Sequence, residues 1–324
     1  MTEQEFIKNC EEKGLTATQA EHCFELYKYS KDIRWSFETA KLDFNGPQMQ
    51  EARLAFENGL TKEQVEFFYK KEFNWVQMRQ GRLAFENKLA KGKVEVFYKQ
   101  EFNWEQMQEA LSAFKNGLTK EQVEVFYKPD FDRYQMAQAR LALENKLTKG
   151  QVRVFYKQEF DSLQMEQSRL ALENGLTKEQ VEFFFRIEFN SDQMKQARLA
   201  FGDGLTKEQV ETFYKKEFDS FQMREARLAF RNGLTREQIE FFYKPGFYHF
   251  QMQQARLAFE NGSTLEQIEC FYKREISWPQ MYEAREAFEN GLSIEQVKEI
   301  LGFVEDKNPV HEVENSTTLM EFFN

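Results

Sequence analysis

Hydrophobic residues recur along this chain at the spacing of helices rather than of strands. Met78, Gly81 and Phe85 follow the i, i+3, i+7 stripe that an amphipathic helix buries. Val65 and Phe68 begin a shorter stripe of the same kind, and polar residues separate the two. The pattern predicts pairs of short helices joined by tight turns. Such helices are marginal alone and draw their stability from packing.

Polar residues mark where these helices begin and end. Asn74 is followed three residues later by Gln77, which is a capping-box signature, and Thr61 opens the same signature before the second helix of a pair. The first helix is expected to end at Asn58 and Gly59, because both residue types adopt the left-handed conformation at low cost.

These signals also predict the helix lengths. The first helix of each pair should contain about eleven residues and the second about nine. In the first pair, the second helix should therefore stop between Lys70 and Glu72.

The dipeptide Gln-Met recurs with a constant step of 29 residues. Its methionines are Met49, Met78, Met107, Met136, Met165, Met194, Met223, Met252 and Met281. An unbroken register of this kind indicates supersecondary units that each pack on their neighbours. The sequence therefore predicts an all-α fold, an α-solenoid of nine 29-residue helix-turn-helix repeats over residues 48–308.

The two ends of the chain depart from this register. Residues 1–47 are predicted to form an N-terminal helical cap, with helix starts at Thr2 and Thr16 and a helix end at Gly14. Residues 309–324 form an acidic C-terminal tail, which is either disordered or folds back over the last repeat.

Composition supports helical packing and disfavours several chemistries. The chain has 35 phenylalanines against 5 prolines and 15 glycines. Cys10, Cys23 and Cys270 match no zinc or disulfide spacing, and packing is favoured over a redox role for the first two. The 3 histidines are scattered, and no phosphate-binding loop is present. We expect no enzymatic activity, no metal site and no cofactor.

No apolar stretch long enough to span a membrane and no signal peptide is evident, so a cytoplasmic protein is expected. The net charge is −10, of which the repeats carry −4. A solenoid that follows a nucleic-acid backbone should carry positive repeats, because its affinity comes largely from neutralising phosphates. Nucleic acid is therefore a disfavoured partner.

The motif F-[ND]-x-x-Q-M-x-x-A-R-L-A-[FL]-E-N-G-L extends from Phe131 to Leu147 and from Phe189 to Leu205, with local departures. It resembles short tandem helical repeats in proteins of Firmicutes mobile elements. The resemblance covers about four fifths of the chain. It implies a repeat module in a phage or transposon setting, without catalytic residues.

Two basic columns and one aromatic column run through the repeats. The arginines are Arg53, Arg82, Arg140, Arg169, Arg198, Arg227, Arg256 and Arg285, and the second column contains Lys70, Lys99, Lys128, Lys157, Arg186, Lys215, Lys244 and Lys273. Each arginine either pairs with an acid such as Glu57, Glu63 or Glu66, or faces a groove and binds phosphates or carboxylates. The aromatic column that begins at Tyr69 is expected to pack between repeats rather than to stack on bases.

Positions that vary between repeats gather where one repeat joins the next. Drift on a free surface explains them, and so does an edge that recognises a partner. Large side chains there are of the kinds that anchor interfaces, namely Trp75, Trp104, Arg133, Tyr134, Tyr248, Phe250 and Trp278.

These features favour a non-enzymatic repeat scaffold that binds a protein. The resemblance adds a phage or mobile-element setting, with an effector or inhibitor of a host defence complex as the expected role. The alternatives are a binder of nucleic acid or nucleotides that uses the Arg, Lys and Tyr columns, and a structural assembly scaffold.

Overall fold

The computed structural model describes residues 2–303, which form 21 α-helices and no strand. The helices are α1 (Glu3–Glu12), α2 (Ala17–Ser30), α3 (Ile33–Ala40), α4 (Gly46–Glu57), α5 (Lys62–Phe68), α6 (Trp75–Glu86), α7 (Lys91–Phe97), α8 (Trp104–Lys115), α9 (Lys120–Phe126), α10 (Arg133–Glu144), α11 (Lys149–Phe155), α12 (Ser162–Glu173), α13 (Lys178–Phe184), α14 (Ser191–Gly202), α15 (Lys207–Phe213), α16 (Ser220–Arg231), α17 (Arg236–Phe242), α18 (His249–Glu260), α19 (Leu265–Phe271), α20 (Trp278–Glu289) and α21 (Ile294–Ile300). The all-helical prediction is confirmed for these residues. The predicted tail and the end of the ninth predicted repeat lie outside them.

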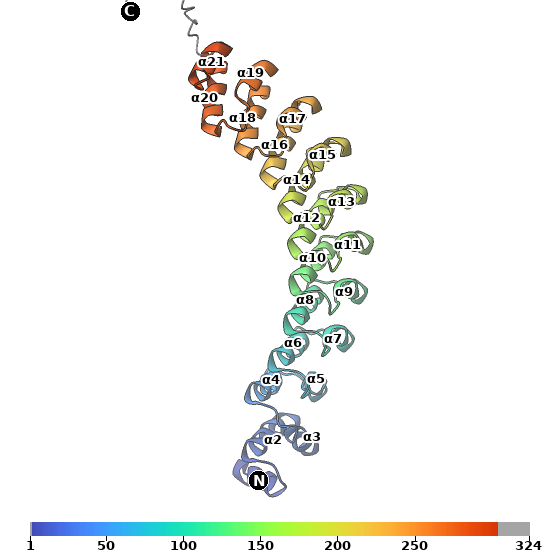
Figure 1. Ribbon diagram of the computed structural model, residues 1–324. Coiled ribbons are helices and arrows are strands. Elements are labelled where there is room, and N and C mark those ends of the chain that lie inside the picture. The colour runs from blue at the N-terminus through green and yellow to red at the C-terminus, as the bar shows by residue number, and fades with distance from the viewer. Residues whose placement is uncertain (1, 304–324) are drawn as a thin grey trace, which may run out of the picture. The chain divides into compact units, whose positions relative to one another are not determined.

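The described residues divide into two compact units, one that ends at Gly204 and one that begins at Leu205. In the first unit, the 12-residue helices α4, α6, α8, α10, α12 and α14 pack one against the next. The 7-residue helices α5, α7, α9, α11 and α13 form a second row beside them (Figure 1). Consecutive helices therefore pack as they do in an α-solenoid.

The second unit repeats this arrangement. Its 12-residue helices α16, α18 and α20 pack in sequence, and the 7-residue helices α15, α17, α19 and α21 accompany them. The short helices α15, α17 and α19 also contact the long helix that follows each of them, and so cover part of its apolar side.

Capping boxes begin the helices as the sequence predicts. Asn74 accepts a hydrogen bond from the backbone N–H of Gln77, and the side chain of Gln77 accepts one from the N–H of Asn74. The second helix of the first pair is shorter than expected, since α5 ends at Phe68 rather than beyond Lys70. Tyr69 turns the backbone out of the helix there, with φ −82° and ψ 82°.

The turn inside each pair depends on a left-handed residue. Gly59 has φ +82°, whereas Asn58 stays at φ −86° and does not share the left-handed role predicted for it. Lys88 and Lys146 occupy the glycine position in two pairs, at φ 60° and 72°. Both lysines therefore bear the steric cost of this conformation, which a glycine avoids.

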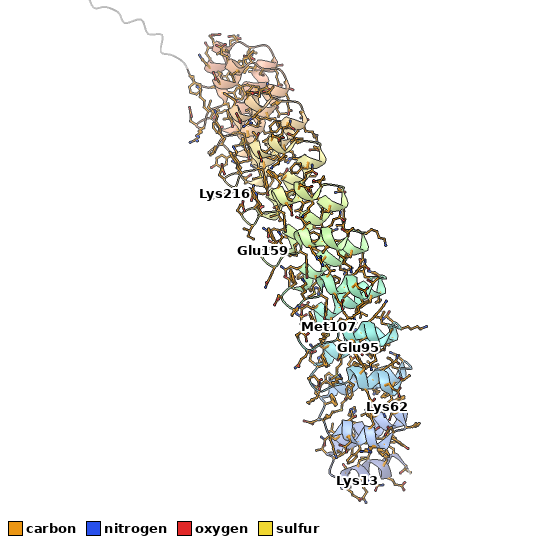
Figure 2. All side chains as sticks on the ribbon, turned by 90° about the vertical axis from the view of Figure 1, so that its right-hand side faces the viewer. Lys13, Lys62, Glu95, Met107, Glu159 and Lys216 are labelled. Atoms are coloured by element: carbon orange, nitrogen blue, oxygen red, sulfur yellow. The ribbon has the colours of Figure 1, made fainter. Side chains whose placement is uncertain are left out.

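Side chains fill the space between the two rows of helices. Met107, labelled in Figure 2, and Phe126 are fully buried in the first unit, and Met223 and Phe242 are their counterparts in the second. Glu159, also labelled there, lies on the exposed connection between α11 and α12. Met107 and Met223, which belong to the column that recurs every 29 residues, are thus part of the core.

Hydrogen bonds join the pair of α8 and α9 to both of its neighbours. The amide nitrogen Nε2 of Gln106 donates to the backbone oxygen of Phe131, at 2.7 Å. The hydroxyl of Tyr127 donates to the backbone oxygen of Phe97, at 2.8 Å. The same tyrosine ring stacks on Phe102, with centroids 3.8 Å apart. The predicted packing role of the tyrosine column is thus confirmed for Tyr127.

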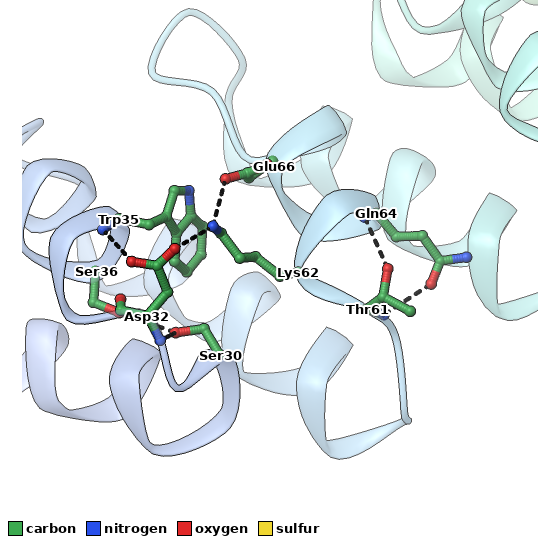
Figure 3. Close-up of polar contacts among 8 residues, drawn as sticks. All are labelled: Ser30, Asp32, Trp35, Ser36, Thr61, Lys62, Gln64 and Glu66. Atoms are coloured by element: carbon green, nitrogen blue, oxygen red, sulfur yellow. Dashed lines mark hydrogen bonds and ion pairs between the residues drawn. The ribbon is translucent and has the colours of Figure 1, made fainter.

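The N-terminal residues add α1, α2 and α3 before the paired helices. Lys62 of α5 binds Asp32 at 2.5 Å and Glu66 at 3.5 Å, and its Nζ lies 5.6 Å from the centroid of the Trp35 ring (Figure 3). Asp32 also caps α3. These contacts attach α3 to the first pair. Helix α4 begins at Gly46, so a boundary between residues 47 and 48 falls within its first turn.

Cys10 and Cys23 do meet, as the sequence allows. Their sulfur atoms are 3.8 Å apart, and both are buried free thiols in the apolar cluster of α1 and α2. Burial raises the pKa of Cys23 to about 12, and the neighbouring Cys10 adds to the shift. The Cys23 thiol therefore stays protonated near neutral pH, which agrees with the packing role.

Within residues 2–303, none of the helices has both the length and the apolar character needed to cross a membrane.

Candidate functional site

The exposed aromatic side chains lie at the N-terminal turns of the long helices. In the first unit, Trp75 and Trp104 are the first residues of α6 and α8, and Tyr134 is the second residue of α10. Trp75 is 41% exposed, Trp104 37% and Tyr134 61%. A side chain in this position extends away from the core, because the helix buries the stripe that begins one turn later.

A groove of about 550 Å³ lies on the surface between the packed helices α6 and α8. Trp75 and Trp104 line it together with Arg79, Leu111 and Lys115. It therefore combines apolar walls with two cations. This is the composition of a site for a segment that carries an apolar side chain beside a polar or acidic one.

A buried acceptor without a donor lies in the same groove. Gln80 is only 5% exposed, and its Oε1 makes no hydrogen bond within the described residues. Glu51 and Glu109, at the equivalent place in α4 and α8, accept hydrogen bonds from the arginines 31 residues later. The residue 31 positions after Gln80 is Leu111, whose side chain has no hydrogen-bond donor. The Gln80 oxygen is therefore left without a partner.

Arg133 and Tyr134 form the next part of this surface. Arg133 Nη1 donates to Glu105 Oε1 at 3.0 Å, and its guanidinium lies 5.1 Å from the centroid of the Tyr134 ring. The hydrogen bond with Glu105 raises the pKa of Arg133. The arginine is thus held in place by its neighbours, while the tyrosine ring remains open to solvent.

In the second unit the exposed rings touch one another. Phe221 stacks on His249 with centroids 5.0 Å apart, and Phe250 lies 4.0 Å from the same histidine. The Trp278 ring lies 5.5 Å from Phe250. One continuous aromatic strip therefore crosses the N-terminal turns of α16, α18 and α20.

Tyr248 lies beside this strip and breaks the capping rule. It is the N-cap of α18, where α16 has Asp219, and its side chain makes no capping hydrogen bond. The ring is 76% exposed. A tyrosine there loses about 1 kcal/mol of capping energy relative to aspartate and exposes an apolar ring. Departures of this kind concentrate at functional sites.

The arginine column is largely paired with acids. Arg82 donates from Nε to Glu51 at 2.7 Å and from Nη1 to Glu86 at 2.6 Å. Arg140 and Arg256 make the same two ion pairs, Arg169 and Arg285 replace the first carboxylate with a glutamine, and Arg53 makes one exposed pair with Glu57.

Arg198 binds only a glutamine, and Arg227 is buried. The prediction that these arginines pair with acids is confirmed for Glu57 and for the equivalent residues Glu86, Glu144, Glu173, Glu260 and Glu289. It is wrong for Glu63 and Glu66: Glu63 lies in the capped first turn of α5, and Glu66 pairs with Lys62.

The tyrosine column is buried, whereas the lysine column is largely exposed. Tyr98, Tyr127 and Tyr156 are buried, and each hydroxyl donates to a backbone oxygen of the preceding pair. Most of the lysines are exposed, but acids surround them. Lys99, for example, lines a pocket together with Glu95 and Glu124.

Sequence reasoning missed Phe221, Leu163 and the unpartnered Gln80. The first two occupy the variable column that begins at Val76, so their size was the available signal. Gln80 had no local signal, because its lost partner lies 31 residues away. Within residues 2–303, no group of three or more His, Cys, Asp or Glu side chains is arranged to hold a metal ion.

Comparison of the chain with protein-family models, with curated proteins and with solved structures finds no match.

Proposed function

We propose that this protein is a non-enzymatic α-solenoid of nine 29-residue repeats that binds a protein partner. The binding surface in the first unit is the groove of Trp75 and Trp104, extended by Arg133 and Tyr134. In the second unit it is the strip of Phe221, His249, Phe250 and Trp278 with Tyr248. The mobile-element setting and the inhibitor role remain predictions from the resemblance.

The groove between α6 and α8 is the observation that carries this proposal. Its apolar walls lie beside Arg79 and Lys115, so a segment that carries an apolar side chain next to an acidic one matches its lining. Two tryptophans frame the entrance, and tryptophan is among the residues that most often dominate binding energy. A protein segment offers the apolar side chain and the polar group together.

The contacts of the basic columns disfavour the alternative of a nucleic-acid binder. The paired arginines already direct their donors to glutamates, and acids interrupt the exposed lysines. The buried tyrosine rings have no face available for a base. No contact in residues 2–303 specifically favours the assembly-scaffold alternative.

Site-specific photo-crosslinking tests the proposal. A photoreactive amino acid at position 104 should capture a protein in extracts of the native host, whereas the same residue at Lys120, an exposed position on a short helix, should not. Trp75→Ala should then lower the affinity for the purified partner about thirtyfold, which is about 2 kcal/mol, and leave helicity unchanged.

The alternative, in which the arginine column binds the ligand, makes the opposite prediction. If Arg169→Ala abolishes binding without altering the melting temperature, and Trp75→Ala has no effect, the binding surface has been placed wrongly. Affinity that falls steeply with salt would in addition identify phosphates as the ligand.

A further inference from the structure

Glutamates near the ends of the long helices are each held by two donors. In α10, Glu144 Oε1 accepts hydrogen bonds from Arg140 Nη1 at 2.9 Å and from Asn116 Nδ2 at 2.9 Å. The arginine belongs to the same helix, and the asparagine follows the preceding long helix, α8. The same triads are Arg82, Asn58 and Glu86; Arg169, Asn145 and Glu173; Arg256, Asn232 and Glu260; and Arg285, Asn261 and Glu289.

At α14 both donors of such a triad are present, Arg198 in the helix and Asn174 after α12, but the glutamate is missing. Gly202 stands where the five triads have their glutamate, four residues after Arg198. Arg198 Nε still donates to Gln167 Oε1 at 3.1 Å, just as Arg169 Nε donates to Gln138 at 2.9 Å. The guanidinium is therefore anchored in the usual place. Its Nη1 and the Nδ2 of Asn174 have no hydrogen-bond partner within residues 2–303.

The vacated position is open. A Cβ atom added to Gly202 meets no atom within 4 Å, and the glycine is not in the left-handed region, so a side chain fits there without strain. Gly202 and Asn174 are exposed, and Arg198 is half-buried. A ligand in solution can thus approach the two donors directly.

The charge of Arg198 is also incompletely balanced. Burial lowers the pKa of its guanidinium, and the acid that opposes this shift, Glu166, is itself 3.7 Å from Arg169. The group stays protonated all the same, because arginine does not lose its proton in proteins. A half-buried cation without its own carboxylate gains most from an anion that supplies charge-assisted hydrogen bonds.

We propose that the position vacated at Gly202 binds a carboxylate group of a second molecule, held by Arg198 Nη1 and Asn174 Nδ2. The geometry is the one in which this protein already holds five of its own carboxylates within residues 2–303. The carboxylate comes either from a protein side chain or from a free organic acid. This site is separate from the aromatic residues proposed above and does not depend on them.

Acetate titration by NMR tests the site in the full chain. Sodium acetate replaces sodium chloride at constant ionic strength, while the side-chain amide signals of Asn174 and the Nε–Hε signal of Arg198 are followed. Asn174→Ala and Arg198→Leu assign these signals. We expect saturable shifts with a dissociation constant on the order of 1–10 mM, as befits two hydrogen bonds to a charged group.

Two substitutions of the glycine separate binding from folding. Gly202→Glu places an internal carboxylate in the position and should abolish the acetate shifts, whereas Gly202→Ala leaves the position open and should retain them. Glu173→Ala vacates the equivalent position in α12 and should create a second acetate site beside Arg169 and Asn145. Shifts that do not saturate in the parent, or that persist in Gly202→Glu, would overturn the proposal.

Further probes identify the source and the class of the ligand. A blocked tripeptide, acetyl-Ala-Glu-Ala-amide, should bind at least as tightly as acetate if the site takes a protein side chain, and its glutamine analogue should not bind. If acetate binds and the glutamate peptide does not, the ligand is a free acid, and the site stands. Inorganic phosphate that binds more tightly than acetate would overturn the assignment to a carboxylate.

Discussion

The hydroxyl group of Tyr127 lies 2.8 Å from the backbone oxygen of Phe97, the last residue of a helix in the preceding pair. Both residues are buried. The last carbonyls of a helix have no partner within it, so a buried helix end needs a donor from elsewhere. The backbone N–H of Lys99 supplies one donor to the Phe97 oxygen, at 3.0 Å, and Tyr127 supplies a second. Burial raises the pKa of the Tyr127 hydroxyl, which keeps its proton in place.

Removing this hydroxyl should destabilise the first unit. Tyr127→Phe is expected to lower the free energy of unfolding by about 0.5–1.5 kcal/mol, because it removes one of the two hydrogen bonds that a buried oxygen accepts. Urea denaturation followed by circular dichroism measures the change.

Phe185 provides the matched control, since it occupies the same column without a hydroxyl and stacks on Phe160 at 3.7 Å. Phe185→Tyr should stabilise the protein by up to about 1 kcal/mol through the oxygen of Phe155. A Tyr127→Phe variant as stable as the parent would show that the bond is not a source of stability.

Gln106 should not tolerate replacement by glutamate. Its Oε1 accepts from the N–H of Asn103 at 2.9 Å, and its Nε2 donates to the oxygen of Phe131. Gln106→Glu keeps the first bond but turns the second into a contact between two oxygens. We expect a loss of about 1–3 kcal/mol, measured by urea denaturation. The same Nε2 also donates to the oxygen of Pro129 at 3.2 Å, a contact that the glutamate likewise loses. Gln108→Glu, at an exposed position of the same helix, should change stability little; equal effects would contradict this role of Gln106.

The buried arginines should prove structural. Arg256 lies 2.8 Å from Glu225 and 2.7 Å from Glu260, and all three side chains are largely buried. Arg256→Met leaves two carboxylates without a counterion, which should cost about 3–5 kcal/mol. Arg53→Met, which removes an exposed pair with Glu57, should cost about 0–1 kcal/mol. Differential scanning calorimetry compares the two, and an unchanged melting temperature for Arg256→Met would contradict the structural role.

His22 should make the first unit sensitive to acid. Burial lowers its pKa from 6.5 to about 4, and its Nε2 lies 2.8 Å from the hydroxyl of Tyr69. Because the folded pKa is the lower one, this group's contribution is full above pH 6.5 and is lost as the pH falls toward 4. The total loss approaches about 3 kcal/mol.

Urea denaturation at several pH values between 7.5 and 4 measures this dependence. His22→Gln keeps a neutral polar side chain and should show a shallower decline over that interval. Glu21 and Glu25 line the cavity beside His22 and are present in both proteins, so the difference between the two curves isolates the histidine. Parallel curves would show that His22 is not the source of the acid sensitivity.

Local sequence patterns predicted the helices and most of their caps. The signals at Asn74 and Thr61 act over three residues, so the amino-acid order alone decides them. The N-cap at Tyr248 has no such signal, and the helix nevertheless begins there, because packing of the repeat overrides the lost cap. Lys146 shows the same override at a turn that favours glycine.

Only the tertiary structure decided which partners the polar side chains have. Gln106 reaches an oxygen 25 residues later, Tyr127 one 30 residues earlier, and Arg82 a carboxylate 31 residues earlier. The spacing of the repeats indicates that neighbouring pairs meet, but the offset at which two helices pack determines which atoms come within hydrogen-bonding distance. The orphaned oxygen of Gln80 and the vacant acceptor position at Gly202 are therefore visible only in the folded protein, because each is the loss of a contact between residues far apart in the sequence.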